Sequence, residues 1–502
     1  MSDRLLKNLC SAAGQTVVQT AVLVLLYRYL LHTIGIEKLG VWSVVLATTS
    51  ASRVSELGLS GSVTKFVAKY RAQKLDRVAE EVLQTAAISL SLALGAVLFI
   101  SYPALAWALK HILPPASLAD AELILPFAMV SLWLTSMAGV WMGGLDGCLR
   151  SDLRAAVTII GSFSFLLLSL VTVKRYGLTG LALAQVAQGA ILVCLGWIAL
   201  RRAMHSLPLL PTCWKGRLFK EMVGYGANLQ VNSVVTLLFE PTTKVLLVRF
   251  GDLATVGYFE MAQRVVAKVR ALAVESNQVI VPVFAELHEK DYGKTRALYL
   301  RNLEYMAFVV TPVFAALAAL APAISEAWIG RYEVSFVAIV ILISLAWFVN
   351  TLTAPAYFAY LGGGKLGWIT ISHLVMGAVN AIGGIALGKL FGWQGVTAAF
   401  CIALALGSVV TTWAYHRENR IVEASIFAAH NLAFGITCFG GAALLLVTYS
   451  AALAIDASKW LRIGSSAAAA LILISAAIWI HPLRQRIVPE VMARLRRKLA
   501  TK

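Results

Sequence analysis

The sequence has little charge, and nowhere does it have a polar stretch long enough to form a soluble domain. Of its 502 residues, 14% are Asp, Glu, Lys or Arg and 59% are hydrophobic, and the mean hydropathy is +0.78. Soluble domains carry about 25% charged residues. The composition therefore excludes a soluble protein and indicates one that crosses a membrane many times.

The sequence also lacks the motifs of several enzyme classes. Its six cysteines are scattered and none forms a CxxC pair, so they are most simply free thiols rather than disulfides or metal ligands. It has no paired acid and base, no metal-ligand cluster and no phosphate-cradling glycine loop. Because a nucleotide-binding segment is also missing, an ATP-driven pump would need a partner. We expect neither catalytic residues nor a metal or cofactor.

Fourteen apolar stretches of about 20 residues predict membrane spans. They are centred near residues 20, 49, 93, 134, 164, 189, 234, 263, 312, 347, 378, 404, 438 and 470. The first follows Arg4 and Lys7 without a small-residue cleavage pattern, which predicts a retained anchor. The even-numbered loops and the termini hold 27 lysines and arginines, and the odd-numbered loops hold seven. Since cytoplasmic loops hold the excess, both ends are predicted to be cytoplasmic.

The net charge of +18 does not require a nucleic-acid partner. Most of it lies in the short loops assigned to the cytoplasm and in the tail, residues 483–502. Membrane orientation explains the loops. The basic tail is suited either to an interfacial helix on anionic lipid or to a solvated end. We therefore expect membrane lipids, and no nucleic acid, as partners.

The second half of the sequence repeats the first at an offset of 215 to 217 residues. The matching segments are IGIEKLGVW (34–42) with FGDLATVGYF (250–259), DGCLR (146–150) with LGGGK (361–365), and KRYGLTG (174–180) with KLFGWQG (389–395). Each unit holds six spans, so both enter the membrane in the same direction, as in transporters with parallel repeats. The prediction is an all-α fold with two six-helix lobes, 1–202 and 203–417, and a third segment, 418–502, with two extra helices and the basic tail.

Cations concentrate in the first two spans of each predicted lobe. Arg264 lies eight residues past the outer turn at Val256, about 12 Å into the membrane at about 1.5 Å per residue. A mid-bilayer arginine costs about 2.5–3.5 kcal/mol, so it normally faces a protein interior or a water-filled cavity. A cavity lined by the first two spans of each lobe would be cationic, and it would suit an anion, phosphate in particular. The candidate substrate-binding residues are Arg28, Arg53, Glu56, Glu240, Lys244, Arg264, Lys268 and Arg270.

Structural interpretations stay open for the same residues. Arg53 with Glu56, Glu240 with Lys244, and Glu260 with Arg264 have the three- and four-residue spacing of ion pairs on one helix. Arg28 and Lys244 lie close enough to the outer face to reach the headgroups. Lys268 and Arg270 lie near the cytoplasmic end of their span, where water would solvate them. Polar residues in spans one and seven are suited to sugar hydroxyls or to neighbouring helices; they are Gln15, Gln19, Asn228, Gln230 and Asn232.

Several of these segments resemble a known family. They are the turn GIEKLGVWS, the segment RVSELGLSGSVTKFVAKY after it, and VGYFEMAQRVVAKV, which runs on to Pro282. With the fourteen spans and the six-plus-six repeat, they are similar to the polysaccharide-type, Wzx-like flippases of the multidrug, oligosaccharidyl-lipid and polysaccharide exporter superfamily. The resemblance extends over nearly the whole chain.

The resemblance implies a function and a binding site. Proteins of this family have two lobes in a V that opens alternately to each side, and they move polyprenyl-diphosphate-linked oligosaccharides outward across the bacterial inner membrane. The related lipid II flippases use arginines of helices one, two and eight for the diphosphate. By similarity these roles fall to Arg28, Arg53 and Arg264. The family also implies coupling to a cation, a proton or sodium, and a monomeric transport unit.

Two other functions stay open. A drug antiporter of the same superfamily would need buried carboxylates without matching arginines, whereas the first two spans offer only Glu56, beside Arg53. A membrane polymerase or ligase would need catalytic residues in sizeable outer loops. The longest predicted outer loop, residues 101–121, offers only Lys110, His111 and Asp120.

Overall fold

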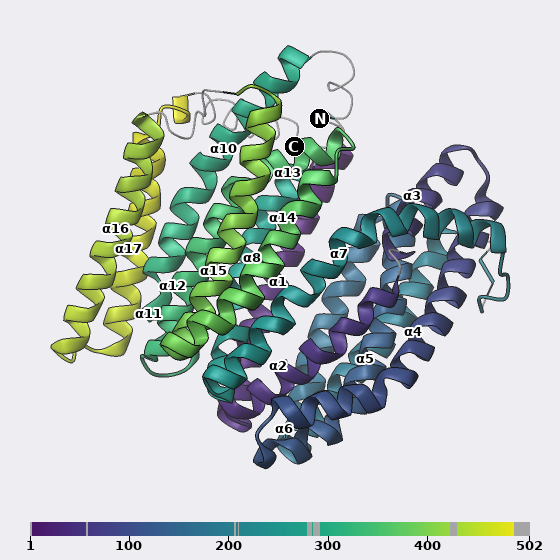
Figure 1. Ribbon diagram of the computed structural model, residues 1–502, viewed down its shortest axis with the longest axis horizontal. Coiled ribbons are helices and arrows are strands. Elements are labelled where there is room, and N and C mark those ends of the chain that lie inside the picture. Colours follow the sequence, from purple (N-terminus) through teal and green to yellow (C-terminus); the bar gives the residue numbers. More distant parts are fainter. Residues whose placement is uncertain are drawn as a thin grey trace, which may run out of the picture. The chain divides into compact units, whose positions relative to one another are not determined.

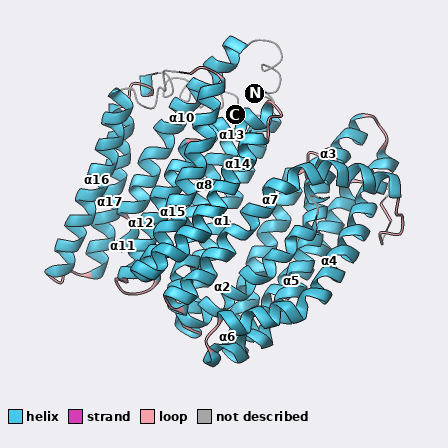
Figure 2. Cartoon of the chain, viewed as in Figure 1, coloured by secondary structure: helices cyan, strands magenta, loops and turns pink. Residues whose placement is uncertain are grey.

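Helices form almost all of the chain (Figure 2). The structure is a computed structural model that describes residues 3–56, 59–204, 207–208, 210–278, 284, 292–421 and 429–485. These residues contain helices and no strand. The predicted all-α class is confirmed.

The chain divides into two compact units. Unit 1 consists of Met1–Glu260 and Gly388–Val396, and unit 2 of Met261–Leu387 and Thr397–Lys502. The helices that begin in unit 1 are α1 (Asp3–Thr33), α2 (Ile36–Ser50), the 3₁₀ helix η1 (Ala51–Glu56), α3 (Leu59–Ala72), α4 (Asp76–Ile112), α5 (Pro115–Gly147), α6 (Ser151–Ala203), α7 (Gly216–Phe250) and α8 (Leu253–Gln278) (Figure 1).

Helix α8 continues into unit 2. The other helices that lie wholly or mostly in unit 2 are α10 (Tyr292–Ala319), α11 (Ala321–Trp328), α12 (Val334–Leu352), α13 (Ala354–Gly362), α14 (Gly367–Ala378), the π-helix η2 (Val379–Gly383), α15 (Gly384–Glu418), α16 (Ala429–Ala454) and α17 (Lys459–Ile480). The segment Gly388–Val396 of α15 belongs to unit 1. The lobe boundaries at 203 and 418 come from the repeat and stay a prediction.

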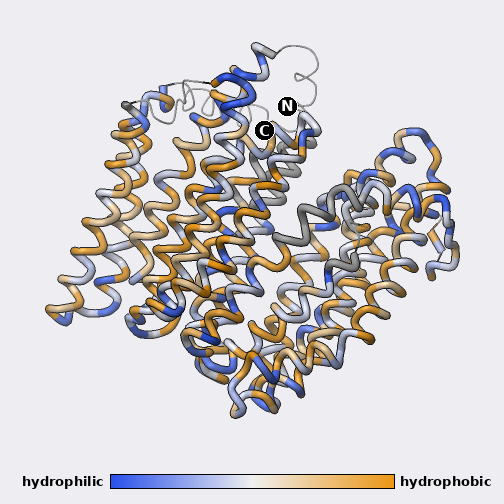
Figure 3. Tube along the Cα trace, in the orientation of Figure 1, coloured by the Kyte–Doolittle hydropathy of each residue, from blue (hydrophilic) through white to orange (hydrophobic). Residues whose placement is uncertain are grey.

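Nine helices in the described part of the chain are long and apolar enough to cross a membrane. Their middle turns are mostly hydrophobic, and hydrophilic residues lie mainly near the helix ends (Figure 3). The spans expected near residues 49, 234 and 263 lie in α2 to α3, α7 and α8, which carry more charge and are not among the nine. The count of fourteen spans therefore stays a prediction.

Two of the nine candidate stretches, Ser151–Ala203 and Gly367–Glu418, are hairpins. Within α6, Gly177 has φ 55° and ψ −130°, and within α15, Gly392 has φ 62° and ψ −141°. Side chains avoid this left-handed region because the Cβ atom clashes with the backbone, so glycine lets the chain reverse. The reversal brings the Thr172 hydroxyl to the Gly180 carbonyl at 2.7 Å. Helix α6 therefore contains the spans expected near residues 164 and 189, and the continuous helical stretch Gly367–Glu418, from α14 to α15, contains those expected near 378 and 404.

The internal repeat has counterparts in the backbone. Gly177 and Gly392 lie 215 residues apart, within the matched segments 174–180 and 389–395. Leu149 and Gly364, also 215 apart, both have positive φ, 57° and 69°. Helices α2 and α8 begin at Ile36 and Leu253, an offset of 217. Local chain geometry thus recurs where the sequence repeats.

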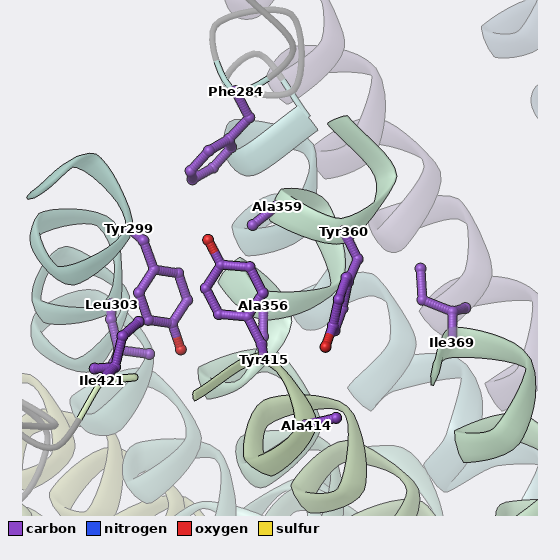
Figure 4. Packing of buried hydrophobic residues seen from close by; sticks show 10 residues of the cluster. All are labelled: Phe284, Tyr299, Leu303, Ala356, Ala359, Tyr360, Ile369, Ala414, Tyr415 and Ile421. Atoms are coloured by element: carbon purple, nitrogen blue, oxygen red, sulfur yellow. The ribbon is translucent and has the colours of Figure 1, made fainter. Parts of the chain in front are cut away.

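Aromatic packing builds much of the core of unit 2. Figure 4 shows Tyr299 of α10, Tyr360 of α13 and Tyr415 of α15 packed together, with Tyr299 and Tyr415 ring centroids 4.6 Å apart. Elsewhere in this unit, Arg462 of α17 forms a buried ion pair with Glu326 of α11. This pair fixes α17 to the helices of unit 2.

Candidate functional site

The three arginines that the resemblance assigns to the diphosphate are exposed. Arg28 lies in the last turns of α1, Arg53 in η1, and Arg264 in the portion of α8 that belongs to unit 2. Glu56 is the last residue of η1. The Glu56 side chain lies outside the described residues. The side chains of Asn228, Gln230 and Asn232 also lie outside the described residues, and only their helical backbone is described.

Lys244 is not a free cation. It is 4% exposed, and its Nζ lies 2.7 Å from Glu240 Oε1 and 2.6 Å from Glu260 Oε2. The predicted pair between Glu240 and Lys244 is present, but the shorter contact is with a carboxylate of the next helix. Because Lys244 is buried between two carboxylates, it does not reach the headgroups.

Hydroxyl groups from two further helices complete this site. The Tyr27 hydroxyl of α1 donates to Glu260 Oε1 at 3.3 Å, and the Ser43 hydroxyl of α2 donates to Glu260 Oε2 at 3.1 Å. We call Tyr27, Ser43, Glu240, Lys244 and Glu260 the Lys244 cluster. It joins α1, α2, α7 and the first turns of α8, all within unit 1.

Close backbone contacts lie beside the Lys244 cluster. A Cβ atom added to Gly40 would lie 2.0 Å from the Leu253 carbonyl oxygen, and one added to Gly257 would lie 2.7 Å from the Ile36 carbonyl oxygen. The contacts are reciprocal, because Ile36 and Leu253, like Gly40 and Gly257, are 217 residues apart. Such pairing is typical of a contact between two related elements around a two-fold axis. The two copies of the repeated turn therefore pack on each other.

A second polar network surrounds Arg270 in unit 2. The Arg270 guanidinium carbon lies 4.4 Å from the Trp347 ring centroid, and Arg270 Nε donates to Asn350 Oδ1 at 3.2 Å. Trp347 donates to Gln263 Oε1 at 3.1 Å, and the Asn350 amide donates to the Ser408 hydroxyl at 2.8 Å. We call these five residues the Arg270 network. Arg270 and Lys268 are half-buried rather than fully solvated.

No sequence pattern predicts Trp347, Asn350 or Ser408 as neighbours of Arg270, because they lie 77 to 138 residues from it. An arginine, a tryptophan and an amide on separate spans form no motif. The only available signal was the presence of Trp347 and Asn350 three residues apart, on one side of a span.

Unit 1 also contains a pocket of about 400 Å³. It is lined by residues of α1, α3, α5 and α6, among them Gln15, Thr64, Thr135 and the ion pair of Asp146 with Arg154. Gln15 was suggested for sugar hydroxyls, whereas the ion pair was missed. Because the two charges neutralise each other, the pocket offers hydrogen-bonding groups without a net charge.

These features define the class of protein: a multi-pass helical membrane protein built by internal duplication. The chain belongs to the polysaccharide biosynthesis protein family, whose model matches residues 34–355. The family resemblance found in the sequence is thereby confirmed. No curated protein matches the chain by sequence.

Solved structures share the fold. The lipid II flippase MurJ, in an inward closed conformation, has a TM-score of 0.70 at 12% identity, over 96% of this chain and 100% of that one. An inward-facing multidrug resistance MATE family transporter of the MOP superfamily has a TM-score of 0.69 at 14% identity, over 82% and 100%. A MOP superfamily transporter from Pyrococcus furiosus has a TM-score of 0.61 at 12% identity, over 82% of this chain and 96% of that one. The fold is that of MOP transporters.

Proposed function

We propose that the protein is a flippase that moves a polyprenyl-diphosphate-linked oligosaccharide from the cytoplasmic to the outer leaflet of the bacterial inner membrane by alternating access. The observation that carries this proposal is the family match over residues 34–355, in a family described as polysaccharide biosynthesis. The similarity to a flippase over 96% of the chain supports it. A membrane polymerase or ligase has no such support, because the solved structures with this fold are named as transporters and a flippase.

Exposed arginines support an anionic substrate. Arg28, Arg53 and Arg264 are exposed, and a planar guanidinium suits a diphosphate because it forms two parallel hydrogen bonds. We assign the diphosphate to these three residues and to Arg270. Lys244 and Glu240 belong instead to the Lys244 cluster, where they join helices.

A multidrug antiporter is the second candidate. The MATE family transporter has nearly the same structural similarity, with a TM-score of 0.69. An organic cation would require carboxylates that are not neutralised by a cation. In the Lys244 cluster, however, both carboxylates contact one ammonium group. This pairing favours the flippase over the antiporter.

Depletion of the protein in its host tests the function. We expect a lipid-linked glycan to accumulate on the cytoplasmic face of the membrane, where added glycan-modifying enzymes reach it in inside-out vesicles. Restoring the wild-type chain should remove the accumulated intermediate. If no intermediate accumulates and the depleted cells become sensitive to cationic drugs, the protein is an antiporter.

Arg264 provides a variant test. Arg264→Ala should fail to remove the intermediate, and Arg264→Lys should act only in part because the planar fork is lost. Arg249→Ala is the matched control, since Arg249 is an exposed arginine near the end of α7. Both variants should insert into the membrane at the wild-type level. Full activity of the alanine variant would remove Arg264 from the site.

A further inference from the structure

Helix α17 has an exposed tryptophan near each end. Trp460 and Trp479 are 73% and 71% exposed, and they lie 19 residues apart, about 28 Å at about 1.5 Å per residue. The hydrocarbon core of a bilayer is about 30 Å thick, and tryptophan is enriched at its two interfaces. Between the two indoles, Leu471 and Ile472 are exposed and the one charged residue, Arg462, is buried. Trp479 therefore marks the interface beside the C-terminal tail.

The chain beyond α17 is fixed against α16, which lies beside α17 (Figure 1). His481, the first residue after the helix, is buried, and its Nε2 donates to Asn431 Oδ1 of α16 at 2.8 Å. Its Nδ1 accepts a hydrogen bond from the Leu483 backbone N–H at 3.2 Å, so the ring proton is on Nε2. The Leu483 side chain is buried and packs in a cluster with Phe434. These contacts fix the backbone that leads into Arg484.

The guanidinium of Arg484 lies on the Trp479 ring without a hydrogen-bond acceptor. Its Cζ is 4.0 Å from the ring centroid, within the range of a cation–π contact. Nη1 is buried without a partner, and in the described part of the chain no acceptor or carboxylate contacts the Arg484 side chain. A buried donor without an acceptor is costly, and more so on a charged group. Because the side chain is half-buried rather than enclosed, the rest of the guanidinium is open to a ligand.

Three features of this corner are suited to one phospholipid molecule. The planar guanidinium matches a phosphate group, to which it donates two parallel hydrogen bonds. Ile480, next to Trp479, is 62% exposed and is suited to an acyl chain. Residues 483–502 contain seven lysines and arginines and one acidic residue, Glu490, so their charge favours a lipid with a net negative charge. A free phosphate ion would not use the apolar contact.

We propose that Arg484 and Trp479 form a binding site for the headgroup of an anionic phospholipid, in the leaflet beside the C-terminal tail. The Arg484 guanidinium donates to two oxygens of the lipid phosphate, and Trp479 holds its plane at the interface. His481, Asn431 and Leu483 position the two residues. The charge of the tail predicts attraction to any anionic surface, whereas this site predicts one bound lipid. The inference goes beyond the proposed function and does not depend on it.

Native mass spectrometry of the purified full-length chain tests the site, with phosphatidylglycerol added to the detergent micelles. The measured quantity is the affinity for the first bound lipid. Arg484→Gln should weaken it by about tenfold or more, since a hydrogen bond between charged groups is lost. Arg484→Lys should recover only part of the affinity, because it keeps the charge and loses the planar fork. Trp479→Leu, which stays apolar but removes the indole, should weaken binding by about three- to tenfold.

Arg175→Gln is the matched control. It also removes an exposed arginine beside an aromatic ring, that of Tyr176, at the hairpin turn of α6. This variant should bind phosphatidylglycerol as the wild type does. Wild-type affinity in both Arg484→Gln and Trp479→Leu would overturn the site. An equal loss in Arg175→Gln would also overturn it, because the total charge would then decide.

Thermal unfolding in micelles separates binding from folding. Without added lipid, Arg484→Gln should unfold at the wild-type temperature. Added phosphatidylglycerol should raise the unfolding temperature of the wild type more than that of Arg484→Gln, because a ligand stabilises the state that binds it. If Arg484→Gln unfolds at a lower temperature without lipid and gains as much from lipid as the wild type, Arg484 is structural and the site is overturned.

Two further ligands test the chemistry of the site. Phosphatidylcholine has the same phosphate and acyl chains but a compensating ammonium group, so it should bind more weakly than phosphatidylglycerol. Equal affinity would overturn the preference for an anionic lipid. Inorganic phosphate should not displace phosphatidylglycerol, because it lacks the acyl chains. Displacement would assign the site to a soluble anion and overturn the lipid.

Discussion

Lys244→Met removes the ammonium group that lies between the carboxylates of Glu240 and Glu260. Lys244 and Glu260 have side-chain exposures of 5% and 3%, whereas Glu240 is 40% exposed. Removing one partner of a buried ion pair costs about 3–5 kcal/mol, because a charge stays in the interior without its partner. We expect Lys244→Met to lower the free energy of unfolding by about this amount.

The two carboxylates should contribute differently to the free energy of unfolding. Glu260→Gln leaves Lys244 in contact with Glu240 at 2.7 Å, so the loss should be smaller, about 1–3 kcal/mol. Glu240→Gln removes a carboxylate that water also solvates, and its cost should be below about 1 kcal/mol. The expected order of destabilisation is therefore Lys244→Met, then Glu260→Gln, then Glu240→Gln.

A double-mutant cycle gives the decisive measurement. The combined Lys244→Met and Glu260→Gln variant leaves no charge in the interior of the Lys244 cluster apart from the water-accessible Glu240. It should be more stable than the sum of the two single changes predicts, by about 1–3 kcal/mol. Equilibrium unfolding in mixed micelles, followed by tryptophan fluorescence, measures all four proteins. Additive single effects, or a wild-type stability of Lys244→Met, would refute the reasoning.

Two further predictions concern unit 1. Gly257→Val should lower the free energy of unfolding by about 1–3 kcal/mol, because its Cβ would meet the start of α2 at 2.7 Å. The control is Gly435→Val in α16, where an added Cβ has no atom within 4 Å. Equal unfolding free energies of the two variants would contradict the contact. If Arg53 binds substrate, Arg53→Ala and the double replacement of Arg53 and Glu56 should both lose transport, while both variants insert into the membrane normally. Recovered transport in the double variant would make Arg53 a structural partner of Glu56.

Much of the architecture could be predicted from the sequence because it depends on local properties of the chain. Insertion into a membrane requires about 20 consecutive apolar residues, which can be counted along the sequence. The hairpins at Gly177 and Gly392 depend on glycine in a left-handed conformation, and the repeat marked both turns. The helix starts at Ile36 and Leu253 likewise lie at the predicted offset.

The candidate site could be predicted only in part. The sequence indicated which spans carry cations, and four-residue spacing predicted the contact between Glu240 and Lys244. Spacing along one helix gives no information on the next helix, so the shorter contact, between Lys244 and Glu260, was not predicted. Arg270 was named from the sequence without Trp347, because a position in one span does not show which residue of another span it faces.

The sequence by itself determined that this protein is a duplicated helical membrane protein of the polysaccharide biosynthesis family. Apolar length and turn residues act within short stretches of chain, and the repeated segments can be compared directly, so the order of residues is enough to predict them. Only the tertiary structure decided the partner of each buried charge. Lys244 joins two carboxylates, whereas Arg270 lies on an indole ring with no carboxylate among its described neighbours. Such pairing follows from the packing of side chains between helices, where an ammonium or guanidinium contacts whichever group the neighbouring helix brings within about 3–4 Å.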